Sequence, residues 1–210
     1  MIKDGRLDDR GQAFPIYVVA VAGLLFAALA FFVVGMAGDT RSEAQGAADA
    51  AALAAAREAR DDAFVGLNLA DLKPADWEEI LNGKGFDVKS ACAEAESFAE
   101  RNNATTVQCE AVLPRFTVSV KTIRTIGQSV VPGTGAMHGE AVATAVIKPL
   151  CSLGSEPAPT TTPAPADTGV PKPGPVNITC DGRASIELDP LNPGPLSKLA
   201  RTLFSVRLAS

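Results

Sequence analysis

The side chains that could carry chemistry in this chain are few, and their spacing favours structural roles over catalysis. The one histidine, His138, lies two positions before Glu140 in a glycine-rich stretch. Hydrolysis needs a nucleophile held beside a base, and the sequence shows no such pair. The segment 131–135 lacks the lysine of a phosphate-binding loop. We expect no catalytic residue and no cofactor, with a cell-wall enzyme that uses His138 and Glu140 as the alternative.

A group of carboxylates surrounds the single tryptophan, Trp77, and raises the question of a metal site. The group consists of Asp71, Asp76, Glu78 and Glu79. Carboxylates can bind Ca²⁺, but their spacing here is not that of an EF-hand loop. Acidic residues after a proline are typical of a helix start, where they face the positive end of the helix dipole. We therefore predict a helix beginning near Pro74 and no metal site.

Four cysteines could form covalent links. They are Cys92, Cys109, Cys151 and Cys180. None has the C-x-x-C spacing of a zinc ribbon or a thioredoxin-type site. An even number in an exported region suggests two disulfides, and three pairings are available. We favour Cys92–Cys109, which would tie a helix to the first strand, and Cys151–Cys180, which would close a loop around a proline-rich stretch. Free buried thiols are the alternative.

Composition and charge exclude two broad classes of protein. Of the 210 residues, 47% are hydrophobic, which is too many for a disordered chain. The formal net charge of −5 lacks the excess of Lys and Arg that a phosphate-binding surface needs. We therefore expect a folded protein with no nucleic-acid partner.

The longest uncharged stretch, residues 11–38, has the length of a membrane span. As a helix it would extend about 42 Å, whereas the hydrocarbon core of a bilayer is about 30 Å thick. Tyr17 lies near its start, where an interfacial anchor would be. A secretory signal cleaved near Met36 is the alternative, but signal apolar regions are shorter, at about 7–15 residues. We predict a transmembrane helix over residues 11–38.

The basic residues around this segment predict its orientation. Lys3, Arg6 and Arg10 precede it, and Arg41 is the only basic residue in the first 15 that follow. Cytoplasmic flanks of membrane helices carry the excess of Lys and Arg. We therefore predict a cytoplasmic tail over residues 1–10, a single pass through the cell membrane, and an extracytoplasmic C-terminal region.

Residues 39–62 are rich in alanine and predict a juxtamembrane helix that continues the membrane span. Arg41, Gln45 and Asp49 recur at every fourth position and share one face, whereas Leu53 is the one larger apolar residue. Small side chains allow close approach of a neighbouring element. We predict an interaction surface at these four residues, for the protein's own domain or a partner subunit; a stiff stalk is the alternative.

The exported region predicts a small domain of mixed structure over residues 63–154. Residues 88–101 favour a helix with Ser90 at its N-cap, and alternating apolar residues favour strands near 107–113, 116–120 and 139–148. A helix packed on an antiparallel sheet follows. The overall class is α+β, with a single N-terminal membrane helix, an alanine-rich continuation, and a disulfide-bonded sheet domain.

The C-terminal third begins with a segment that cannot form a core. Residues 155–175 contain seven prolines and predict an extended loop or linker. Residues 176–210 then predict a hairpin that turns at Asp181-Gly182, followed by an amphipathic helix over 196–208. This helix would dock on the domain or lie on a membrane surface.

The N-terminal pattern resembles a known family. Arg10-Gly11-Gln12-Ala13, a long apolar helix, and then Arg41-x-x-x-Gln45-x-x-Ala48-Asp49-Ala50-Ala51-Ala52-Leu53 are similar to TadE/TadG-like proteins of Flp (tight-adherence) pilus assembly, in their actinobacterial TadG-related form. Residues 105–148 resemble the family's strand-rich domain more loosely. Ile16 stands where a prepilin carries Glu, and Asp181–Ser185 differ from the metal motif of larger TadG proteins.

The resemblance implies a non-catalytic component of pilus assembly or secretion. Its partners would be the membrane and other pilus-assembly or pilin-like subunits, with a homo-oligomer as a further arrangement. A generic anchored surface protein with a Pro/Thr stalk is the alternative function.

Overall fold

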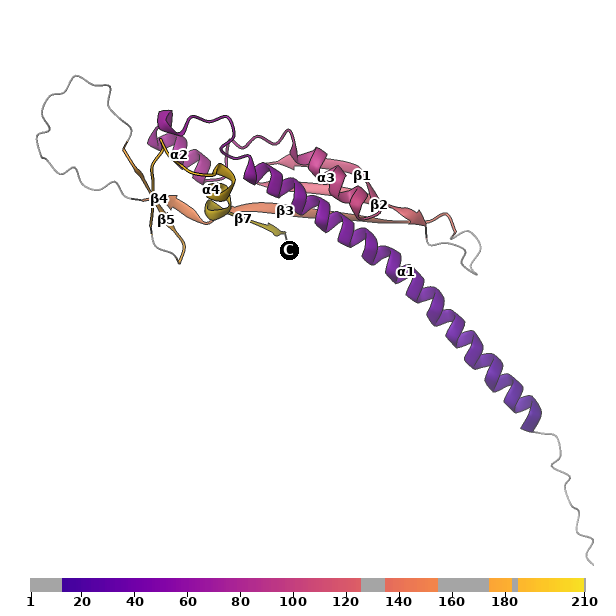
Figure 1. Cartoon of the computed structure of the whole chain (residues 1–210). Helices are drawn as coiled ribbons and strands as arrows, with labels where there is room; N and C mark the ends of the chain where they lie inside the picture. The colour runs from indigo at the N-terminus through magenta and orange to yellow at the C-terminus, as the bar shows by residue number, and fades with distance from the viewer. Residues whose placement is uncertain (1–12, 126–134, 155–173, 183–184, 210) are drawn as a thin grey trace, which may run out of the picture.

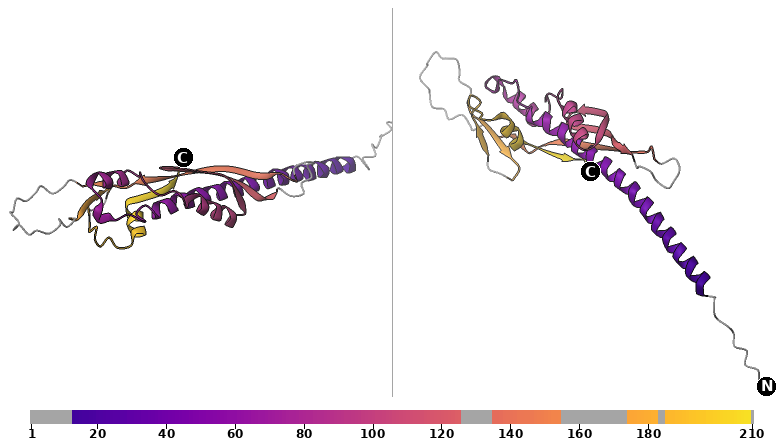
Figure 2. Two further views of the ribbon diagram at one scale, coloured as in Figure 1. Left: turned by 90° about the horizontal axis from the view of Figure 1, so that it is seen from above. Right: turned by 45° about the vertical axis from the view of Figure 1, so that its right-hand side comes forward.

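One long helix dominates the architecture. The computed structural model describes residues 13–125, 135–154, 174–182 and 185–209 (Figure 1). Helix α1 (Ala13–Asp61) has 49 residues, which correspond to about 73 Å. It runs without a break through both segments that we predicted, because no proline follows Pro15 and alanine favours the helix throughout the second half. Its first half projects from the domain (Figures 1 and 2).

The larger sheet is antiparallel and lies against the second half of α1. Its strands are β1 (Ala104–Val112), β2 (Arg115–Thr125), β3 (His138–Pro149) and β7 (Phe204–Leu208), in the order β1-β2-β3-β7. Helix α3 (Ala91–Arg101) lies beside α1 and contacts β1. Alternate side chains of the central strands are buried, among them Phe116 and Val118 of β2 and Ala145 of β3. The core therefore lies between one face of this sheet and the two helices.

A smaller layer closes the end of the domain that is remote from the projecting half of α1 (Figure 1). It consists of η1 (Leu69–Asp71), α2 (Pro74–Leu81), α4 (Leu196–Leu203), and a sheet of β4 (Cys151–Leu153), β5 (Val176–Cys180) and β6 (Ile186–Leu188) in the order β4-β5-β6. The predicted α+β class, with an apolar N-terminal helix and an antiparallel sheet domain, is confirmed.

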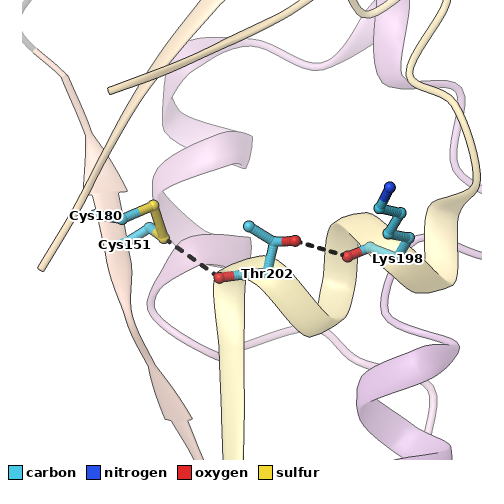
Figure 3. The surroundings of a disulfide bond; sticks show 4 residues. All are labelled: Cys151, Cys180, Lys198 and Thr202. Carbon is cyan, nitrogen blue, oxygen red and sulfur yellow. Dashed lines mark hydrogen bonds between the residues drawn. A yellow bond between two sulfur atoms is a disulfide. The ribbon is translucent and has the colours of Figure 1, made fainter. Parts of the chain in front are cut away.

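Both favoured disulfide pairings are confirmed. Cys92 of α3 is bonded to Cys109 of β1, and Cys151 of β4 to Cys180 of β5. The second disulfide lies against the end of α4, where the Cys151 Sγ atom is 3.8 Å from the carbonyl oxygen of Thr202 (Figure 3). This is a packing contact, because a disulfide sulfur has no proton to donate.

The C-terminus differs from our prediction of a helix over 196–208. The helix ends at Leu203, and Phe204 begins strand β7, which pairs with β3 from Ala145 to Pro149. The cause is a change of apolar period: Phe204 and Val206 alternate with Ser205 and Arg207. Both Phe and Val favour strands, and the edge of β3 supplies backbone partners.

The other local predictions are met in part. Strands β5 and β6 form the predicted hairpin, but Ile178 pairs with Ile186, which leaves one residue more in the connection than a two-residue turn at Asp181-Gly182 allows. Ser90 is the N-cap residue of α3, as predicted, but its hydroxyl donates to Asp62 Oδ2 at 3.2 Å and makes no capping hydrogen bond. The predictions for residues 1–10, 131–134 and 155–173 lie outside the described residues.

Candidate functional site

The first half of α1 exposes an unbroken apolar surface. Residues Phe14–Phe32 are long and apolar enough to cross a membrane, and 0% of that window is buried inside the protein. The side chains are large: Phe14, Leu24 and Phe31 are each more than 70% exposed. Side chains of this size on every side of a helix fit a surrounding apolar solvent, because water would disfavour their exposure.

The second half of α1 has the opposite character. Apart from Thr40, its buried residues are alanines that are at most 3% exposed: Ala44, Ala47, Ala48, Ala51, Ala52, Ala54, Ala55, Ala56 and Ala59. They allow the helix to approach the sheet closely. At Gly139 of β3, an added Cβ atom would collide with the carbonyl oxygen of Thr40 and lie 3.1 Å from Ala44 Cβ. Helix and strand therefore meet nearly backbone to backbone.

The predicted interaction residues lie on the remaining side of this half. Arg41 and Gln45 are exposed, and Asp49 is half-buried. The Gln45 side-chain amide donates a hydrogen bond to Asp49 Oδ1 at 2.8 Å, so the two neighbours on the helix face form a polar pair. Leu53 differs from the other three, because it is half-buried and packs against the protein's own core. Thus Arg41, Gln45 and Asp49 form the outward polar stripe, whereas Leu53 also contributes to the domain.

The end of α1 is tied to the C-terminal helix by charge. Arg201 of α4 donates to Asp61 at 2.6 Å, and Arg60 donates to the same carboxylate at 2.8 Å. Partial burial alone would raise the pKa of Asp61, but the hydrogen bonds from Arg201 and Arg60 outweigh it and lower that pKa below its usual value. The pKa of Glu58, one turn earlier, is raised by partial burial and then by the negative charges of Asp62, Glu94 and Asp61.

His138 and Glu140, the two residues that a cell-wall enzyme would use, contact neighbouring residues of β2. The His138 Nδ1 atom is 2.7 Å from the Thr122 carbonyl oxygen, and Gly139 N donates to Thr122 Oγ1 at 2.9 Å. Glu140 lies 3.6 Å from Lys121 on the neighbouring strand. These contacts join the ends of β2 and β3 beside α1.

The acidic group around Trp77 is also structural. Asp76 Oδ2 accepts a hydrogen bond from the Lys73 backbone N–H at 2.8 Å, which stabilises the start of α2. Trp77 itself is 1% exposed. Within the described ranges, no three His, Cys, Asp or Glu side chains are grouped closely enough to hold a metal ion.

Sequence reasoning missed a cavity at the end of the domain remote from the exposed half of α1. Its volume is about 280 Å³, and its lining includes Leu72, Pro74, Trp77, Leu153 and Pro190. The Trp77 Nε1 atom is buried without a hydrogen-bond partner. Trp77 therefore contributes to the cavity lining, while its indole N–H is buried without a partner. The sequence feature that could have indicated this cavity was the single tryptophan, Trp77, close to Pro74.

The decisive comparison concerns α1. Residues 11–58 match the model of a family described as putative Flp pilus-assembly TadE/G-like. The resemblance that we drew from the apolar run and the alanine-rich stretch is confirmed over this range. The match spans both halves of α1 and ends three residues before the helix does. No curated protein and no solved structure matched the chain.

Proposed function

We propose that this protein is a single-pass, membrane-anchored envelope component of Flp-type pilus assembly or secretion, and that it acts by association and not by catalysis. The observation that carries the proposal is the division of α1: its exposed apolar half suits lipid, and its alanine-rich half holds a folded domain. The similarity to TadE/G-like proteins covers this same helix.

The orientation that we propose places residues 1–10 in the cytoplasm and the domain outside. The basic residues before the span favour this arrangement. The two disulfides support it, because disulfides persist in oxidising compartments and are rare in the cytoplasm. The anchor would be retained, since the apolar run exceeds the length of a signal peptide.

The partner surface that we propose is the polar stripe of Arg41, Gln45 and Asp49, together with the exposed edge of Leu53. The domain packs on the alanine side of α1. The side that carries the polar stripe is therefore left for another helix of the assembly. The stripe lies just beyond the apolar segment, where helices of neighbouring membrane subunits would emerge side by side. Pilin-like or pilus-assembly subunits are the expected partners.

In-cell photocrosslinking tests this surface. A photoreactive amino acid at Gln45 is expected to give adducts with pilin-like or pilus-assembly subunits, identified by mass spectrometry after membrane solubilisation. Leu191 is the matched control, because it is 45% exposed and follows Pro190, which lines the remote cavity. Adducts from both positions alike, or none from Gln45 in membrane-inserted protein, would contradict the proposed surface. Self-adducts alone would show that the stripe contacts a second copy of this chain instead of a different subunit.

A further inference from the structure

We propose that the β2–β3 end of the large sheet rests on the lipid surface, as a second membrane contact beside α1. The proposal depends on α1 being the membrane anchor. The residues that carry it are Ile123 and Met137, which are exposed apolar side chains at the ends of these two strands. Their exposed fractions are 55% and 53%.

Strand β3 runs in the same direction as α1, which fixes which end of the sheet faces the membrane. Gly139 packs against Thr40 at the beginning of the domain half of α1. At the other end, Leu150 N donates to the Leu203 carbonyl of α4, the helix whose Arg201 is bound to Asp61. The strand from 139 to 150 extends about 36 Å, and the helix from 40 to 61 about 32 Å. Figure 1 shows β3 inclined to α1 and crossing its second half.

The height of this end above the bilayer follows from the helix rise. The apolar surface of α1 ends between Phe32, the end of the candidate span, and Gly38, the last residue before a charge. Thr40 therefore lies about 3–12 Å beyond the hydrocarbon edge. Met137 precedes Gly139 by two residues, and because β3 is inclined to α1 it lies at most about 7 Å nearer the membrane. This places Met137 between about 4 Å inside and about 12 Å outside the hydrocarbon edge, a range that includes the headgroup region.

The chemistry of this end suits an interface. Beside Ile123, Arg124 is bound to Glu43 of α1 at 3.6 Å, which holds the end of β2 against the helix where the helix leaves the membrane. Apolar side chains with neighbouring basic groups at this height match the composition of membrane interfaces. The strand end lies next to the apolar half of α1, so the bilayer that surrounds this half can also contact the strand end.

The contact would restrict the domain. With α1 alone, the domain could rotate about the helix axis and tilt with it. A second contact at the β2–β3 end restricts the tilt of α1 and determines the side toward which the helix leans.

Quenching by brominated phosphatidylcholine tests the contact in the full chain, reconstituted in phosphatidylcholine vesicles. The variants Met137→Trp and Ile123→Trp each add one reporter at an exposed site. Leu191→Trp is the matched control at the remote end. The wild-type chain supplies the reference, because its Trp77 is 1% exposed and adjoins the remote cavity. Formation of both disulfides and an unchanged circular dichroism spectrum verify folding.

We expect brominated lipid to reduce the added emission of Met137→Trp, to reduce that of Ile123→Trp less because its register places it level with Gly139, and to leave that of the control unchanged. Equal quenching in all three would overturn the contact. Flotation of the vesicles separates the two proposals: chain that floats without strand-end quenching contradicts only the second contact, whereas chain that stays unbound contradicts the anchor itself.

Discussion

The two halves of α1 are one continuous helix with opposite surfaces. The first half carries large apolar side chains and buries none of them, whereas the second carries alanine and buries most of it. The first half has no charged residue, whereas the second has charged and polar residues on the side that faces away from the domain. The apolar residues of the two halves also differ in size: large side chains suit contact with lipid, and small ones allow a sheet and a second helix to approach the backbone. The following changes test this distinction.

The largest effect is expected where α1 and β3 meet. Gly139→Ala would place a methyl group against the Thr40 carbonyl oxygen of α1, and because that oxygen belongs to the backbone, strand or helix must move. We expect a loss of about 3 kcal/mol in the free energy of unfolding. Chemical denaturation of the full chain in detergent, followed by Trp77 emission, measures it.

Gly46→Ala is the matched control for this change. Gly46 lies on α1 one turn beyond the contact, and an added Cβ atom would meet nothing within 4 Å. Here the substitution should stabilise the helix by about 0.5–1 kcal/mol. If the two alanine variants changed stability in the same direction, the close contact at Gly139 would be wrong.

Enlarging an alanine should be costly only in the second half. Ala55 is 0% exposed, so Ala55→Leu inserts three carbons into a filled space and should cost about 2 kcal/mol. Ala27 is exposed on the first half, and Ala27→Leu should leave domain unfolding unchanged. Equal effects at the two positions would remove the distinction between the halves.

The ion pair between Asp61 of α1 and Arg201 of α4 should depend on pH. The pKa of Asp61 is lowered in the folded protein, so its contribution is present above the unfolded pKa of about 3.9 and disappears as the pH falls through the lower folded value. Asp61→Asn should therefore cost about 1 kcal/mol at pH 7. The difference from wild type should close in acid. A difference that persisted at pH 2 would have another origin.

The smallest effect is expected at Glu58. Its pKa is raised by burial and by neighbouring carboxylates, so the folded state is penalised once the side chain ionises. Glu58→Gln should stabilise the protein by a few tenths of a kcal/mol at pH 7, with no gain below the unfolded pKa of about 4.3. A stability difference of the same size at every pH would exclude the charge as its cause.

Local patterns in the sequence were sufficient for much of this fold. The apolar run and the alanine run predicted α1, period-two alternation predicted β2 and β3, and the even number of cysteines with their positions favoured the two disulfides. The strand after Leu203 was missed because we extended the amphipathic pattern of 196–203 past the point where its period changes.

Contacts between distant segments could not be predicted in this way. Asp61 and Arg201 are 140 residues apart, and only the packing of α4 beside the end of α1 brings them together. The cavity beside Trp77 is formed by segments from four parts of the chain. The polar stripe was visible at once, but only the structure shows that Leu53 differs from Arg41 and Gln45 by packing against the domain.

The most direct test of an exported domain held by a membrane-spanning α1 uses the unmodified chain. Membranes are extracted with alkaline carbonate, and the pellet is treated with a maleimide reagent before and after reduction. The account predicts that the chain stays in the pellet and that Cys92, Cys109, Cys151 and Cys180 react only after reduction. Release into the supernatant, or four cysteines that react without reduction, would contradict it.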